Sequence, residues 1–246
     1  MIEYRAILGV SRLALVGAAF FGLAGTATAE NMFDVAFGVA VNSDYISRGI
    51  TQTEHKPAVS GYVEPSLGII YGGVWASNTE FVGVTDTEID FYAGVRPEIG
   101  PVSLDLGYNF ATSASTLGMG GSGEFYAKAD VAASDNTTIG AQFYANPEDP
   151  TATYIEANAD ITLPHGFGVS GALGAVSNDT VPYTTWNAGI YYMPVEWAKI
   201  DLRYTATNLS AADCQTVTDG GMGDECDARV MVGLSIDTSL SALKAK

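Results

Sequence analysis

Charged side chains occupy every second position along many short segments of this sequence. In one segment, Glu88 and Asp90 alternate with Ile89 and Phe91. Side chains two residues apart lie on the same face of a β-strand, so these charges should gather on one side of a sheet. Over all predicted strands this face carries ten acids, namely Asp34, Glu64, Glu88, Asp90, Asp105, Glu124, Asp130, Glu156, Asp160 and Asp201, and five bases, namely Arg96, Lys128, Lys199, Arg203 and Arg229. Such a face attracts cations inside a channel, and is simply solvated in a soluble protein.

Residue types that catalyse reactions do not gather in a recognisable pattern. The only two histidines, His55 and His165, fall in a predicted loop and a predicted short turn, where neither suits a catalytic triad. The Gly-rich stretch 118–123 lacks the lysine and hydroxyl residue of a phosphate-binding loop. The acids of residues 213–227 do not have the spacing of a calcium loop. The sequence therefore predicts no catalytic residue, cofactor or metal site.

Residues 1–29 have the features of a secretory signal peptide. Arg5 and Arg12 flank or interrupt an apolar run that ends in the small-x-small motif Ala27-Thr28-Ala29, an order typical of a cleaved export signal. A membrane anchor is the alternative, but Arg12 breaks the apolar run. The mature chain, residues 30–246, is expected to form a single domain, because all-β chains of this length commonly remain undivided.

The mature chain is strongly acidic. Without Glu3, Arg5 and Arg12, 27 acidic and 9 basic residues remain, a formal charge near −18. A surface of this charge repels nucleic acid, which we exclude as a partner. The hydrophobic fraction of 47% beside 16% charged residues differs from a disordered acidic tail, so the chain should fold.

About twelve segments alternate between large apolar residues and small or polar ones. In the first, Phe33, Val35 and Phe37 alternate with Asp34 and Ala36. Most segments are near ten residues long, the length that a tilted strand needs to cross a bilayer. After the signal peptide no apolar run is long enough for a transmembrane helix. Period two alone, however, suits a soluble β-sandwich as well as a membrane barrel.

The lengths of the connections favour the barrel. Long connections are expected at residues 43–57, 79–87, 111–123, 146–153, 177–184 and 206–227, and short ones between them at 71–73, 96–101, 134–136, 164–166 and 193–197. Short turns on the periplasmic side and long loops outside are typical of outer-membrane barrels, whereas Greek-key sandwiches have no such alternation. Trp186 and Tyr192 would mark the two interfaces on one strand. We therefore predict an all-β, antiparallel, up-and-down transmembrane β-barrel of about 12 strands, with the charged face toward its lumen.

The stretch NSDYISRGITQTEHKPAVSG, residues 42–61, is similar to the start of a proteobacterial family of TorF-type porins, long known as a conserved domain of unknown function. The matching residues are Asp44, Tyr45, Arg48, Gly49, Gln52, Thr53, Pro57, Ala58, Val59 and Gly61, followed by Trp75-Ala76-Ser77-Asn78, the strand from Glu88 to Gly94, and Cys226-Asp-Ala-Arg229. The resemblance spans nearly the whole mature chain. It implies an outer-membrane barrel that acts as a pore. Family members tend to end in an aromatic residue, whereas this chain continues beyond Leu240 to Ala-Leu-Lys-Ala-Lys.

The stretch from Asp44 to Pro57 is expected to lie at the outer mouth. The chain would leave the membrane near Asn42, pass Tyr45, bend at Gly49, where the missing Cβ permits a bulge, and return after Pro57. The whole connection should be exposed on the cell surface. Arg48 would either contribute to the field at the entrance or pair with a carboxylate of a neighbouring strand, and we favour the pairing.

Cys214 and Cys226 are the only cysteines, and both fall in the longest predicted loop. In an exported chain a disulfide is favoured over metal ligation or free thiols. Its role would be to shape the loop above the mouth.

The sequence thus predicts an outer-membrane protein, surrounded by lipid, that allows passive passage of small hydrophilic solutes with a preference for cations. A non-conducting structural or surface-recognition barrel, with acids and bases paired across a blocked lumen, is the main alternative. An enzyme is the least favoured class. The permeating solute and the oligomeric state do not follow from the sequence.

Overall fold

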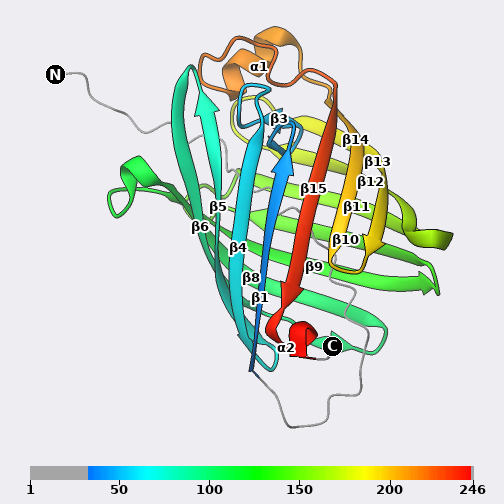
Figure 1. Cartoon of the computed structure of the whole chain (residues 1–246). Coiled ribbons are helices and arrows are strands. Elements are labelled where there is room, and N and C mark those ends of the chain that lie inside the picture. The colour runs from blue at the N-terminus through cyan, green and yellow to red at the C-terminus, as the bar shows by residue number, and fades with distance from the viewer. Residues whose placement is uncertain (1–32, 245–246) are drawn as a thin grey trace.

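The computed structural model describes residues 33–244, so the predicted signal peptide lies outside the described residues. Twelve long strands follow the order of the chain: β1 (Phe33–Asn42), β4 (Ala58–Leu67), β5 (Ile70–Phe81), β6 (Val84–Val95), β8 (Val102–Ser113), β9 (Ser122–Ser134), β10 (Thr137–Ala145), β11 (Thr153–Thr162), β12 (Phe167–Ser177), β13 (Tyr183–Val195), β14 (Ala198–Thr207) and β15 (Arg229–Ser239). Each pairs antiparallel with its neighbours, and β1 pairs with β15, which closes the sheet. The predicted barrel is confirmed (Figure 1).

The remaining elements lie at the two ends of the barrel or in its connections. Helix α1 (Ala211–Val217) belongs to residues 208–228, which cover one end and are called the cap. Helix α2 (Leu240–Lys244) follows β15 at the other end, where the Ser241 amide donates to Asp34 (Figure 1). The short elements are β2 (Ile46–Ser47), β3 (Ile50–Thr51), β7 (Glu98–Ile99) and two 3₁₀ turns, Ala114–Thr116 and Pro164–Gly166. Among the described residues no helix is long and apolar enough to cross a membrane.

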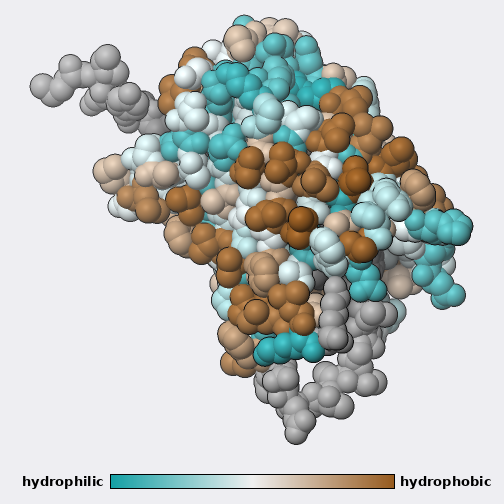
Figure 2. Space-filling view, viewed as in Figure 1, coloured by the Kyte–Doolittle hydropathy of each residue, from teal (hydrophilic) through white to brown (hydrophobic). Residues whose placement is uncertain are grey.

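Alternation along the strands separates an apolar outer face from a polar inner face. The exposed large side chains include Val39, Val41, Val59, Val63, Phe91, Leu106, Ile139, Phe143, Ile155, Leu173, Trp186, Ile190, Leu202, Val232 and Leu234. Figure 2 shows hydrophobic side chains spread over the strands and hydrophilic ones over the cap. Burying this outer area in hydrocarbon is favourable by about 25 cal/mol per Å², whereas in water it would drive aggregation.

Tyrosines lie flat against the inner wall, over glycines of the neighbouring strands. Five directly opposite pairs have this arrangement: Tyr62 with Gly38, Tyr71 with Gly94, Tyr92 with Gly73, Tyr126 with Gly107, and Tyr191 with Gly168. In each pair the ring occupies the space that a Cβ on the glycine would need. A ring that lies along the wall covers the weakly packed glycine backbone and leaves more room near the barrel axis.

One predicted connection is wrong. Residues 79–87 do not form a long loop, because β5 and β6 extend through them and leave only Val82 and Gly83 between the strands. Both residues have positive φ, 49° and 71°, which is the conformation of a two-residue hairpin turn. The sequence does not indicate this turn, because a β-branched residue such as Val82 is unusual at positive φ.

Candidate functional site

The connection between β1 and β4 folds into the barrel at the cap end. Residues 44–53, called the inward hairpin, contain β2 and β3 joined by Arg48 and Gly49, whose φ angles of 48° and 84° define a tight two-residue turn. A Cβ on Gly49 would collide with Thr185 and Thr207 on the inner faces of β13 and β14. The hairpin therefore spans the interior. The predicted bend at Gly49 is present, but as a hairpin turn and not as a bulge.

Most of the inward hairpin is buried, so its expected exposure on the surface is wrong. Ile50 is 1% exposed and Gln52 is 0% exposed, and only His55, Lys56 and Pro57 are well exposed in the second half of the connection. The sequence signal was ambiguous, because short polar residues and glycine suit a surface loop and a polar barrel interior equally.

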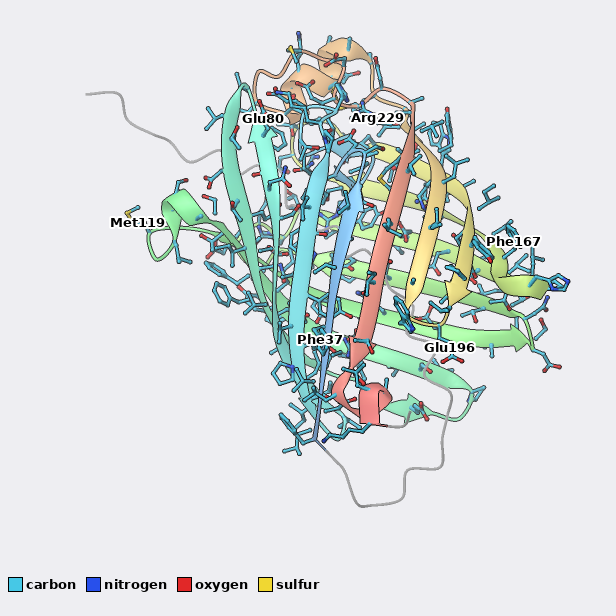
Figure 3. All side chains as sticks on the ribbon, in the orientation of Figure 1. Phe37, Glu80, Met119, Phe167, Glu196 and Arg229 are labelled. Atoms are coloured by element: carbon cyan, nitrogen blue, oxygen red, sulfur yellow. A yellow bond between two sulfur atoms is a disulfide. The ribbon has the colours of Figure 1, made fainter. Side chains whose placement is uncertain are left out.

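Asp44 and Tyr45 hold the base of the hairpin. The Asp44 carboxylate accepts hydrogen bonds from Thr51 Oγ1 (2.5 Å), Thr53 Oγ1 (2.9 Å) and Arg229 Nη1 (3.1 Å). The Tyr45 ring packs edge-on against Trp75, with ring centroids 5.4 Å apart. Arg229 stands at the start of β15 beneath the cap (Figure 3). The predicted mouth residues Asp44 and Tyr45 therefore support the base of the hairpin.

Arg48, at the tip of the hairpin, meets three strands on the far wall. Its two terminal nitrogens donate to the two carboxylate oxygens of Glu124 on β9, at 3.1 and 2.8 Å. Its Cζ lies 5.2 Å from the ring centroid of Tyr144 and 4.8 Å from that of Tyr154. Burial alone would lower the pKa of Arg48, but the Glu124 carboxylate raises it above its ordinary value. The favoured interpretation of Arg48 as a paired side chain agrees with this geometry.

The cap covers the hairpin from the other side. The predicted disulfide joins Cys214 and Cys226, and both cysteines pack with Ile50, Tyr183 and Val217 in one apolar cluster. The Thr51 amide donates to the Glu225 carbonyl at 3.0 Å. The disulfide therefore holds the part of the cap that contacts the hairpin directly.

Two networks of arginines and carboxylates line the wall between this end and the α2 end. Arg96 pairs with Glu64 and Asp105, and its guanidinium lies 3.7 Å from the Tyr71 ring centroid. Tyr71 in turn hydrogen-bonds Asp105 and Tyr126. On the other side of the barrel, Arg203 donates to Asp201, Asn187 and Ser170.

The remaining predicted lumen residues also face inward, with neutral partners in several cases. Asp160 accepts from Tyr191 (2.8 Å), and Glu156 accepts from Gln142 and Tyr154. Lys128 lies 5.2 Å from the Tyr126 ring centroid. Asp90 accepts a hydrogen bond from Asn109 (3.2 Å). Both Asp90 and Glu88 are buried at the end of the barrel that contains the inward hairpin, whereas Asp130 is exposed.

The sequence interpretation missed the tyrosines of the inner face and one acid, Asp237, which lies beside Gly38 and the Tyr62 ring. Their signal was present, since Tyr92 and Tyr126 share the period-two phase of Asp90 and Lys128. The sequence interpretation gives a role at the membrane interface only to tyrosines of the apolar face, such as Tyr192, and assigns none to the tyrosines of the charged face. In the part of the chain that the structure describes, no group of three or more His, Cys, Asp or Glu side chains is arranged to hold a metal ion.

Comparison with known proteins places the fold and the family. A KdgM porin solved in complex with disordered oligogalacturonate superposes with a TM-score of 0.55 at 9% identity, over 82% of this chain and 98% of that chain. The KdgM porin alone gives 0.53 at 10% identity, with the same coverage. No curated protein matches the chain in sequence. The family model that matches carries no TorF designation, so that part of the resemblance stays a prediction. Residues 26–235 match the model described as "Bacterial protein of unknown function (Gcw_chp)", and the chain belongs to this family.

Proposed function

We propose that the protein is an outer-membrane barrel through which small hydrophilic solutes pass, with a preference for cations. The observation that carries the proposal is the closed twelve-strand barrel with an apolar outer face and a polar, charged inner face. A closed barrel satisfies every strand edge in lipid, and the exposed apolar side chains would contact acyl chains. The likeness in fold to KdgM porins, one of them solved with oligogalacturonate, supports passage of solutes without catalysis.

The preference for cations follows from the balance of charges on the inner face. Arg48, Arg96, Arg203 and Arg229 each pair with at least one carboxylate. Among the residues described, the inner-face acids Asp90, Asp130, Glu156, Asp160 and Asp237 take part in no ion pair, and neither do the bases Lys128 and Lys199. Acids therefore outnumber bases there and leave the inner face negative. A negative wall inside a low-dielectric barrel concentrates cations and repels anions.

A non-conducting barrel is the second candidate, and the buried layer at the cap end favours it. Three residues of this layer are almost completely buried, namely Gln52, Asn109 and Glu124. Toward the α2 end, Asp130 and Arg96 are exposed. In the proposed pore, the same layer is the closed state. The α2 end would then be a vestibule open to the periplasm, with the inward hairpin and the cap closing the outer mouth.

Replacing Asp130, Asp160 and Asp237 together by Asn should lower the cation preference. In bilayers with a KCl gradient, we expect the reversal potential to move toward zero by roughly half, because part of the negative wall charge is removed. The preference of the unaltered protein should also weaken at 1 M salt, where the Debye length falls to about 3 Å.

The matched control replaces the same number of exposed acids in the connections, as Asp135→Asn, Glu148→Gln and Asp179→Asn. This variant should keep the original reversal potential within experimental scatter. An anion-selective current in the unaltered protein would contradict the assigned charge of the lumen.

A further inference from the structure

The side chain of Arg48 occupies a site built by strands that are distant from it in sequence. Glu124, Tyr144 and Tyr154 come from β9, β10 and β11, and the hairpin reaches them from between β1 and β4. Glu124 is 76 residues from Arg48. The barrel wall therefore forms a recess for the guanidinium group of Arg48, and the residues of this recess do not belong to the hairpin that carries Arg48.

The chemistry of this recess suits planar organic cations. A carboxylate that faces a guanidinium forms two parallel hydrogen bonds, an arrangement that a spherical cation cannot use. The faces of two tyrosine rings add cation–π attraction, which strengthens when the site is shielded from water. Tyr144 and Tyr154 are themselves fixed, because their rings pack 6.1 Å apart and Tyr154 donates to Glu156. Contacts other than those to Arg48 therefore hold both rings in place.

Two further acids lie near the carboxylate of the recess. Glu88 and Asp90 lie close enough to interact electrostatically, and Asp90 also interacts with Glu124. All three carboxylates are buried, with Glu124 only 2% exposed. Removing the guanidinium would leave Glu124 without its cation, and the buried carboxylate would then take up either a proton or another cation. A guanidinium solute therefore competes with a proton for Glu124 in the absence of Arg48.

We propose that Glu124, Tyr144 and Tyr154 form a binding site for small organic cations that carry a guanidinium group, and that Arg48 occupies this site as an internal ligand. A solute of this class that enters from the cap end competes with Arg48 and releases the tip of the hairpin. The inference deepens the proposed function by naming the solute class, and only its transport step rests on that function. Binding itself is a property of the folded barrel.

Chemical rescue of Arg48→Gly tests the proposal. Glycine suits the positive φ of 48° at this position, so the substitution removes the side chain while the turn is retained. In folded, detergent-solubilised protein, methylguanidinium at up to about 20 mM should bind the variant saturably and raise its melting temperature. Methylammonium and sodium at equal ionic strength should do so at least about tenfold more weakly, because neither forms the paired hydrogen bonds. The unaltered protein should need a higher methylguanidinium concentration for the same response, because the tethered Arg48 side chain competes for the site.

The matched control is Arg48→Gly combined with Glu124→Gln, which keeps the shape of the recess but not its charge. Loss of the methylguanidinium response in this double variant is the expected result. A response of equal size with and without Glu124, or no response in Arg48→Gly, would overturn the proposal. If Arg48→Gly does not fold, Arg48→Gln is refolded in parallel with methylguanidinium and with sodium chloride. We expect a higher folded yield with methylguanidinium than with sodium chloride. Equal yields would overturn the site.

These readouts separate the binding site from the pore. Saturable binding in a protein that stays silent in bilayers would remove the transport function and leave the site. A cation-selective current without any methylguanidinium response would remove the site and leave the pore.

Discussion

Gly94→Ala is expected to destabilise the barrel by about 2–4 kcal/mol, the sum of overpacking and a disturbed buried hydrogen-bond network. A Cβ at this position would lie 2.5 Å from the backbone carbonyl oxygen of Leu106 and 2.6 Å from the Tyr71 hydroxyl. The backbone of a paired strand cannot move aside easily. The Tyr71 ring would be displaced instead, which breaks its hydrogen bonds to Asp105 and Tyr126.

Gly72→Ala is the matched control for this loss. Gly72 lies one strand away on β5, but the nearest atom to its added Cβ is the Tyr92 carbonyl oxygen at 3.5 Å, an ordinary contact. This variant should remain within about 0.5 kcal/mol of the unaltered protein. Urea unfolding in lipid vesicles measures both, and equal losses at the two glycines would contradict the proposed packing of tyrosine on glycine.

Reducing the Cys214–Cys226 disulfide is expected to raise the fraction of time that the pore is open by at least about tenfold. In the chain-entropy model, a disulfide that closes a loop of this size stabilises the ordered state of the connected segment by about 3 kcal/mol. Each 1.4 kcal/mol changes an equilibrium about tenfold. Because the cap packs on Ile50 and accepts a hydrogen bond from Thr51, a looser cap should release the inward hairpin more often.

Reductant added to the cap side of a bilayer is the measurement for this change. The double variant Cys214→Ser and Cys226→Ser should show the raised open fraction from the start and should not respond to reductant. An open fraction that stays constant on reduction of the unaltered protein would show that the cap does not restrain the hairpin.

The strands of the barrel could be predicted from the sequence because period two is a local property. Val39 and Val41 alternate with small residues, and the same rhythm recurs about twelve times with turn residues between. The inward direction of Asp90, Lys128 and Arg203 followed from the same phase. The cysteine pair could also be predicted, because two cysteines in one predicted loop leave few alternatives.

Contacts between distant segments could not be predicted in this way. The pairing of Arg48 with Glu124 depends on the direction in which a loop folds. That direction is set by partners on distant strands such as Thr185 and Thr207, which no local pattern reveals. The pairing of Tyr71 with Gly94 needs the register of two strands, and a shift by one residue would reverse every face.

The most direct test of a pore closed by its own hairpin is a single-channel recording of two proteins in the same bilayer system. One is the unaltered chain, and the other has residues 45–52 replaced by a short Gly-Ser linker, with folding verified for both. We predict brief, small openings in the first and a sustained, larger, cation-selective current in the second, because the linker no longer fills the cap end of the barrel. Silence from both folded proteins would contradict the pore, and equal currents from both would contradict closure by the hairpin.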